Sequence, residues 1–317
     1  MTLHNYTHTH IADLTRQITH RLALSLGITL AFVFVEATAG IFANSLALLT
    51  DAAHNFTDVM ALTLSWWALR LTSQPANRQK TYGYHRAGIL AALVNSTTLV
   101  IIALGIFYEA YRRFINPPEV RADVLIGVGV VAVLVNVVTA LLVRRGAEHD
   151  LNIRSAFLHL MGDVLSTVGA VIAGVVIRFT GWDWLDPLVS VLIGFLILWS
   201  AWSIIREALD ILMESTPADI DMDAMVGDIN SVDGVYGVHD LHVWSINRSM
   251  RTLSAHLVTD DVPISKGTFI QTRVNELLYH KYGVGHATLQ LECEDCVPNL
   301  LYCDIAVANH RHTSPKY

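Results

Sequence analysis

Six long runs of apolar residues dominate the sequence and set the first limit on its fold. They cover residues 21–43, 46–69, 87–110, 124–143, 155–179 and 188–205. Each run is close to the roughly 20 residues that an α-helix needs to cross the hydrocarbon core of a bilayer. With 53% hydrophobic and only 15% charged side chains, the chain also has the composition of a membrane protein. The sequence therefore predicts an α-helical membrane protein with six transmembrane helices.

The polar tail after residue 206 predicts a separate α+β domain. Helical or alternating patterns occur in residues 219–230, 238–246, 252–259, 266–282 and 286–292, in the order αββαβ. We therefore expect four parts along the chain. They are an N-terminal tail with histidines (1–20), a transmembrane domain (21–206), a cytosolic αββαβ domain (207–295) and a C-terminal tail (296–317).

Positive charges in the short loops predict the orientation. Lys and Arg are enriched before the first span, after the second and fourth spans and after the sixth, which favours a cytoplasmic location for both termini. Arg112, Arg113, Arg121 and Arg178 lie on the opposite side, so the bias is incomplete. The first twenty residues lack the apolar core of a signal peptide, and we expect the first span itself to direct insertion.

Charge and cysteine content narrow the range of partners and compartments. The net charge of −7 offers no basic face for nucleic acid, and no nucleic-acid motif is present. Cys293, Cys296 and Cys303 all lie in the tail, where a reducing cytosol would keep them as thiols. Cys293 and Cys296 form a single CxxC, for which a zinc site and two free thiols are alternatives. Histidines near both termini are alternatives for loose metal capture: His4, His8, His10, His310 and His312.

The second span carries polar residues on one helical face. In LTDAAHNFTDVMALTLSWW, Asp51, His54 and Asp58 follow the spacing i, i+3 and i+7. The fifth span repeats the HxxxD spacing with His159 and Asp163. Two imidazole nitrogens and two carboxylate oxygens suit a tetrahedral zinc ion, and ionised groups in a membrane are costly without partners. The two pairs predict a metal site, with Asp51 as a ligand-face or vestibule residue.

Other polar or small residues in the spans have simpler explanations. Glu36 and Asn136 are candidates either for lining a cavity or for hydrogen bonds between helices. Asp186, followed by Pro187, predicts the capped start of the sixth span. Small residues recur every four positions in the fifth span, a pattern that lets membrane helices approach closely. They are Gly162, Ser166, Ala170 and Gly174.

Several stretches resemble the cation diffusion facilitator family, in particular its bacterial zinc, cobalt and cadmium efflux transporters. They read SLALLTDAAHNFTD, TYGYHRAGILAALVN, YEAYRRFINPP, LHLMGDVLSTVGAVIAG, FTGWDWLDPLVSVLIG, VHDLHVW and HATLQLE. The resemblance implies six transmembrane helices, a metallochaperone-like cytosolic domain, a homodimer in the bacterial inner membrane and zinc export in exchange for protons. It places the transport site on His54, Asp58, His159 and Asp163.

The resemblance also places candidate ligands in the cytosolic domain. They are His239, His256 and Glu292, with His242 and His286 as alternates, and their residue types suit zinc. The sequence departs from some relatives in two places. The loop after the second span offers only His85 as a ligand, and the last strand has Gln290 and Glu292 where a His-x-Asp pair occurs in others.

The charge of the membrane site predicts an exchange of metal for protons. Two other interpretations of the site compete with this one. With neutral histidines and ionised aspartates, the four-residue site carries a formal charge of −2, which one divalent ion or two protons would cancel. The alternatives are an intramembrane zinc hydrolase, for which the HExxH motif is absent, and a metal sensor whose tail binds the ion. We expect a transporter rather than an enzyme.

Overall fold

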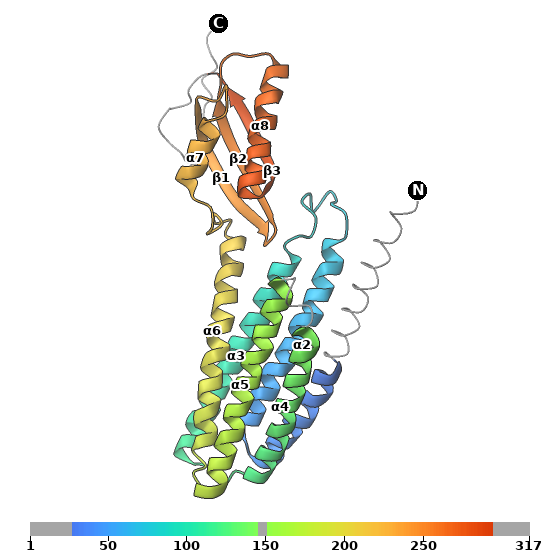
Figure 1. The fold of residues 1–317 in the computed structure, drawn as a ribbon, viewed down its shortest axis with the longest axis vertical. Helices are drawn as coiled ribbons and strands as arrows, with labels where there is room; N and C mark the ends of the chain where they lie inside the picture. The colour runs from blue at the N-terminus through green and yellow to red at the C-terminus, as the bar shows by residue number, and fades with distance from the viewer. Residues whose placement is uncertain (1–26, 145–150, 294–317) are drawn as a thin grey trace, which may run out of the picture. The chain divides into compact units, whose positions relative to one another are not determined.

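The computed structural model describes residues 27–144 and 151–293, and the side chains of 142–144, 151–156, 158 and 159 lie outside the description. The chain divides into two compact units, Met1–Arg70 with Leu90–Ile205 and Leu71–Ile89 with Arg206–Tyr317. Figure 1 shows a helical part and a smaller part built on a sheet. The predicted class, a helical membrane part followed by a small α+β domain, is confirmed.

Long helices make up the first unit. They are Gly27–Ala43, α2 (Leu46–Thr72), α3 (Ala87–Ile115), α4 (Ala122–Arg144), α5 (Leu151–Thr180) and α6 (Leu185–Leu212). Among the described residues, four helices are long and apolar enough to cross a membrane, and these are α3 to α6. The described part of the first helix, Gly27–Ala43, is shorter than these four. The helix α2 is less apolar than they are because it carries the polar residues of the candidate site. Both coincide with predicted spans.

The membrane helices pack around two separate clusters of buried apolar residues. One joins Ala43 and Leu48 to Leu125 of α4 and Ile177 of α5. The other consists of residues from α3 and α6: Leu99, Ala103, Ile193, Ile197 and Ala201. The part of the small-residue pattern near the end of α5 allows close approach, because a Cβ added at Gly174 would lie 3.0 Å from Leu125 of α4.

The second unit has the predicted order αββαβ. Its elements are α7 (Met222–Asn230), β1 (Gly237–Asn247), β2 (Met250–Val258), α8 (Ile264–Tyr282) and β3 (Val284–Glu292). β1 and β2 form an antiparallel pair, and β3 pairs with β2 in parallel after the α8 crossover. α8 ends at Gly283 in the left-handed conformation (φ 66°), which glycine adopts without strain.

One face of this sheet is covered by the two helices. Met225 of α7, Leu241 of β1, Leu253 of β2 and Val274 of α8 belong to a single buried core. The opposite face carries the polar residues of β2 and β3. The sheet therefore presents a covered apolar face and a second face on which ligands can gather.

Asp228 links the two helices of the second unit. Its carboxylate accepts a hydrogen bond from the Tyr282 hydroxyl and pairs with the Lys281 ammonium. These partners, Lys281 first, hold the pKa of Asp228 below its usual value. Burial, together with the nearby Asp228 charge, raises the pKa of Tyr282 to about 12. The pair ties α7 to the end of α8, next to the start of β3.

Candidate metal centres

The first candidate centre lies between α2 and α5. The Nε2 atom of His54 lies 3.2 Å from Oδ1 of Asp163 and 3.9 Å from Oδ2 of Asp58. One ligand atom from each of these three residues lies within 4.8 Å of the others. Ligands about 2.0 Å from a tetrahedral zinc ion would be about 3.3 Å apart, so this spacing fits a zinc-sized ion.

His159 lies in α5 one turn before Asp163, as the HxxxD spacing predicted. Its side chain is outside the described part of the chain. The structure thus brings together three of the four residues expected at the membrane site, and the fourth remains a prediction.

A buried polar network continues from this centre into neighbouring helices. The Thr167 hydroxyl donates to Asp51 Oδ2 at 3.0 Å, and the Asn136 amide nitrogen lies 3.2 Å from the Thr167 oxygen. Asn55 donates to Glu36 at 3.4 Å. Asp51 is almost fully buried, so its predicted vestibule position is not supported. It and Glu36 are both buried beside the ligand face.

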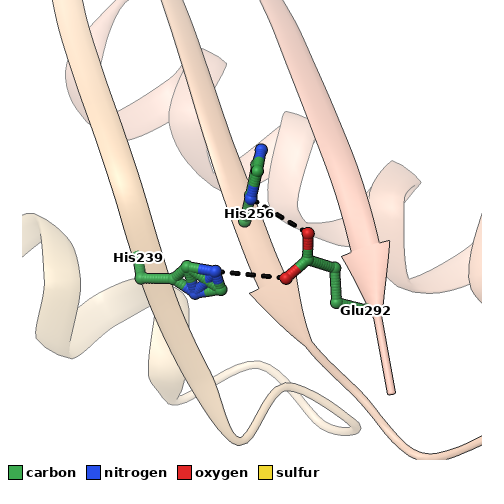
Figure 2. Close-up of side chains that lie close together, drawn as sticks. All are labelled: His239, His256 and Glu292. Carbon is green, nitrogen blue, oxygen red and sulfur yellow. Dashed lines mark ion pairs between the residues drawn. The ribbon is translucent and has the colours of Figure 1, made fainter. Parts of the chain in front are cut away.

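The second candidate centre lies on the sheet of the second unit. His239, His256 and Glu292 come from β1, β2 and β3, one residue from each strand (Figure 2). Oε2 of Glu292 lies 3.1 Å from Nε2 of His239, and Oε1 lies 3.0 Å from Nδ1 of His256. Glu292 therefore stands between two imidazoles, and all three ligand atoms lie within 4.8 Å of one another.

The contact between His239 and Glu292 is not a hydrogen bond. His239 Nε2 and Glu292 Oε2 are buried and have no hydrogen-bond partner, although they lie 3.1 Å apart. Leaving a buried polar atom unsatisfied costs about 1–3 kcal/mol. A cation held between the two atoms would satisfy both of them, and the spacing again matches the ligands of tetrahedral zinc.

A bulge in β1 places the histidines on one face of the sheet. His239 pairs with His256 and His242 with Ser254, so β1 has three steps where β2 has two. In a regular strand, residues three apart point to opposite faces, and one extra residue reverses that. Asp240 occupies the bulge with φ at 47°, in the left-handed region that Asp tolerates better than most residues.

Asp240 also lies beside this centre, although no pattern in the sequence singled it out. Its carboxylate oxygens lie 3.2 Å from Nε2 of His242 and 3.6 Å from Nε2 of His256. The alternate His242 thus lies next to the cluster through Asp240. The other alternate, His286, pairs with Thr252 in the sheet and has its ring beside Tyr82.

The remaining candidate ligands lie at the end of the residues that the structure describes, outside those residues, or apart from both centres. Cys293 is exposed directly after β3. Cys296, Cys303 and the histidines near both termini fall outside the described residues. His85 of the loop after α2 belongs to neither of the two groups of metal-ligand type found among the described residues.

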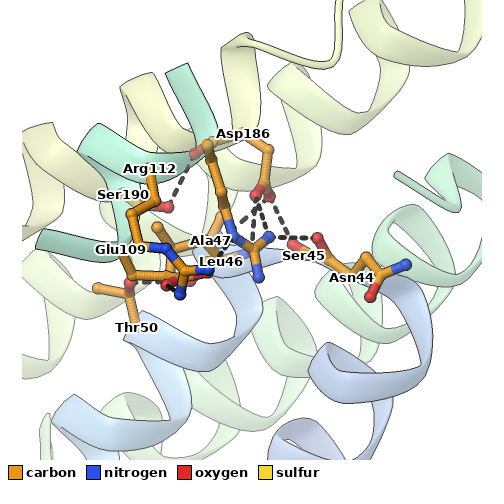
Figure 3. Close-up of polar contacts among 10 residues, drawn as sticks. Asn44, Ser45, Leu46, Ala47, Thr50, Glu109, Arg112, Asp186 and Ser190 are labelled. Atoms are coloured by element: carbon orange, nitrogen blue, oxygen red, sulfur yellow. Dashed lines mark hydrogen bonds and ion pairs between the residues drawn. The ribbon is translucent and has the colours of Figure 1, made fainter. Parts of the chain in front are cut away.

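The prediction that Asp186 caps its own helix is wrong. α6 begins at Leu185, so Asp186 lies in the first turn, and its carboxylate turns to another helix (Figure 3). It accepts hydrogen bonds from the Ser45 hydroxyl and from the backbone N–H groups of Leu46 and Ala47. Asp186 therefore caps α2, a role that a local sequence pattern does not reveal.

Taken together, membrane-spanning helices with imidazole and carboxylate side chains gathered at their interface, joined to a small α+β domain, indicate an integral membrane protein of the cation-transport class. Two family models match the chain, the cation efflux transmembrane domain over residues 22–213 and the cation efflux protein cytoplasmic domain over residues 217–294. The chain belongs to the cation diffusion facilitator family. Its members are transporters, which excludes the zinc hydrolase interpretation.

Relatives cover most of the chain. A cadmium, cobalt and zinc/H(+)-K(+) antiporter of Bacillus subtilis is 39% identical over 276 residues, 86% of this chain and 88% of the relative. The metal cation efflux system protein CzcD of Cupriavidus metallidurans is 33% identical over 87% of both chains. The zinc transporter ZitB of Escherichia coli is 32% identical over 98% of both.

Proposed function

We propose that this protein exports zinc from the cytosol in exchange for protons, and that cadmium and cobalt are further substrates. The observation that carries the proposal is the convergence of His54 and Asp58 from α2 with Asp163 from α5. Of the three relatives described above, one is named for metal cation efflux, one for cadmium, cobalt and zinc antiport and one for zinc transport. His159 is the proposed fourth ligand.

The ligand set explains how metal and protons would exchange. Two neutral imidazoles and two carboxylates give the empty site a formal charge of −2, so one zinc ion or two protons neutralise it. A zinc ligand must be deprotonated, and binding of metal and of protons therefore excludes each other. A site exposed in turn to the cytosol and to the outside would release zinc outward when protons enter from that side.

The proposal also assigns a role to each part of the chain. We place the ion path in residues 21–206 and both termini in the cytoplasm, with the tails 1–20 and 296–317 outside the folded domains. The αββαβ domain, residues 207–295, would hold the two copies of a homodimer together. His239, His256 and Glu292 would bind zinc there as a regulatory ion rather than as cargo.

Zinc uptake into inside-out vesicles tests the proposal directly. Vesicles that contain the protein should accumulate zinc when their interior is acidic, and zinc entry should raise the internal pH. Empty vesicles and vesicles with Asp58→Ala serve as controls. Zinc entry without any proton movement would contradict the exchange, and the absence of zinc entry from correctly inserted protein would contradict transport.

A further inference from the structure

The carboxylate of Asp186 is fully buried and surrounded by donors from the start of α2 and the residue before it. It accepts from the Ser45 hydroxyl at 2.6 Å, from the Leu46 N–H at 2.6 Å and from the Ala47 N–H at 3.2 Å. These residues lie 139 to 141 positions away in the sequence. A buried carboxylate is tolerated when hydrogen bonds of this kind compensate its charge.

This cap completes the N-terminus of α2. The first backbone N–H groups of a helix have no partner within the helix and need one from outside. Ser45 Oγ accepts from the Leu48 N–H at 3.3 Å, which is the ordinary N-cap contact. Asp186 takes the two N–H groups before it, and its negative charge suits the positive end of the helix dipole.

Arg113 of α3 adds a third helix to the joint. Its Nη1 lies 3.7 Å from Oδ2 of Asp186 and donates to the Asn44 carbonyl at 2.5 Å, and its Nε donates to Glu109 at 3.1 Å. Arg113 thus offsets the charge of Asp186 and holds the turn before α2. The start of α2 is fixed against both α3 and α6.

The helix that is fixed in this way is the one that carries His54 and Asp58. His54 lies eight residues after Leu46, about 12 Å along the helix at 1.5 Å per residue. A helix transmits a shift or rotation of its first turn to residues this close. The ligand atoms of α2 therefore keep their place opposite Asp163 only if the first turn keeps its place.

We propose that Asp186 is a positioning residue for cation transport, which caps α2 from α6 and so sets where α2 presents His54 and Asp58 to Asp163. This inference rests on the proposed function of that cluster. Asp186 does not contact the ion. Its loss should weaken the apparent affinity for the transported metal more than the maximal rate at saturating metal.

Zinc flux into proteoliposomes, measured against zinc concentration with the full-length protein, tests the proposal. Asp186→Asn keeps the size of the side chain but turns an amide toward the N–H donors, and we expect the half-saturating zinc concentration to rise about five- to tenfold. Asp186→Glu should recover part of this loss. Ser45→Ala, which removes one of three donors, should raise the concentration about twofold.

The matched control is Asp123→Asn. Asp123 lies in the first turn of α4 and pairs with Arg178 at 2.8 Å, but both side chains are more than half exposed. Its half-saturating concentration should equal that of the unmodified protein. A merely structural role for Asp186 would lower the amount of active protein, and therefore the maximal rate, without changing the half-saturating concentration.

Hydrogen exchange of the peptide that contains the first turn of α2 gives a second readout in the full-length protein. The N–H groups of Leu46 and Ala47 should exchange faster in Asp186→Asn than in the unmodified protein. In Asp123→Asn their exchange rates should be unchanged. If Asp186→Asn does not insert, Ser45→Ala and Asp186→Glu carry both measurements. Wild-type exchange and wild-type half-saturation in the variants that insert would overturn the proposal.

Two further variants separate this proposal from the proposed function. If His54→Ala and Asp58→Ala abolish flux while Asp186→Asn keeps the wild-type half-saturating concentration, only the positioning role is wrong. If His54→Ala and Asp58→Ala transport normally, the cluster between α2 and α5 is not the transport site.

Discussion

The two candidate metal centres use the same kinds of ligand but differ in what holds the ligands. The membrane centre is shared by two helices, α2 and α5, whose ligand residues His54 and Asp163 lie 109 positions apart. The cytosolic centre takes one ligand from each of three hydrogen-bonded strands. Side chains of separate helices change their spacing when the helices move, whereas neighbouring strands keep theirs. The membrane centre therefore suits an ion that must be released, and the cytosolic centre suits one that stays.

Removing the buried charge of the membrane centre should have the largest effect. Asp163→Asn keeps the shape of the side chain but removes one negative charge from a candidate ligand whose side chain is 7% exposed. We expect zinc, cadmium and cobalt flux to fall at least about 100-fold, because an uncompensated charge change of this kind costs several kcal/mol. Proteoliposome flux at matched expression measures this. Glu292→Gln, the equivalent change in the cytosolic centre, should retain most of the flux.

Changing one ligand type should shift selectivity rather than abolish transport. His54→Asp replaces a nitrogen ligand by a carboxylate, which suits larger and more highly coordinated ions. We expect residual zinc flux and about a tenfold gain in the ratio of cadmium or manganese flux to zinc flux. Flux measured metal by metal gives this ratio. An unchanged preference for zinc would argue that His54 is not a ligand.

The cytosolic centre should bind metal yet affect transport only modestly. His239→Ala removes the imidazole whose Nε2 atom lies 3.1 Å from Oε2 of Glu292. Zinc binding to full-length protein that already carries His54→Ala and Asp163→Asn isolates this centre in calorimetry. We expect His239→Ala to weaken that binding at least about tenfold and to reduce zinc flux in the otherwise unmodified protein less than about threefold. Loss of all flux would contradict the division between the two centres.

The smallest expected effect concerns the rigidity of the cytosolic sheet. The pKa of Asp228 is lowered in the folded state, so its contribution to stability is present above its usual value of 3.8 and lost as the pH falls through the lower value. Asp228→Asn should speed hydrogen exchange in β2 at pH 6, and the difference should shrink at pH 3.

The control for this effect is Asp233→Asn, since Asp233 is almost fully exposed and its contact with Arg273 is 3.4 Å long. It should change hydrogen exchange in β2 at neither pH. An equal effect of both substitutions would mean that the contacts of Asp228 with Lys281 and Tyr282 do not stabilise the domain.

The fold followed from local patterns, because hydropathy and periodicity depend on neighbours in the sequence. The membrane helices and the order αββαβ were predictable for this reason. Repetition of HxxxD likewise pointed to a shared site, since the spacing puts each pair on one helical face. The contact between His54 and Asp163 required the arrangement of the helices, which the sequence alone did not specify.

The features that the sequence did not reveal depend on contacts between distant residues or on backbone irregularity. Asp186 was expected to cap α6, because Asp before Pro is a common start of a helix, and its true partners lie in α2. Asp240 was not among the predicted site residues, because regular alternation along a strand would place it on the face opposite His239. The bulge, visible only in the pairing of β1 with β2, explains its position.

Accumulation of zinc driven by a pH gradient alone tests the central claim, that the membrane centre carries the ion and the cytosolic centre does not. Proteoliposomes with equal zinc on both sides and an acidic interior should accumulate zinc with the unmodified protein and with His239→Ala combined with Glu292→Ala. Asp58→Ala should accumulate none. Accumulation by Asp58→Ala, or its loss in the correctly inserted cytosolic double variant, would contradict the account.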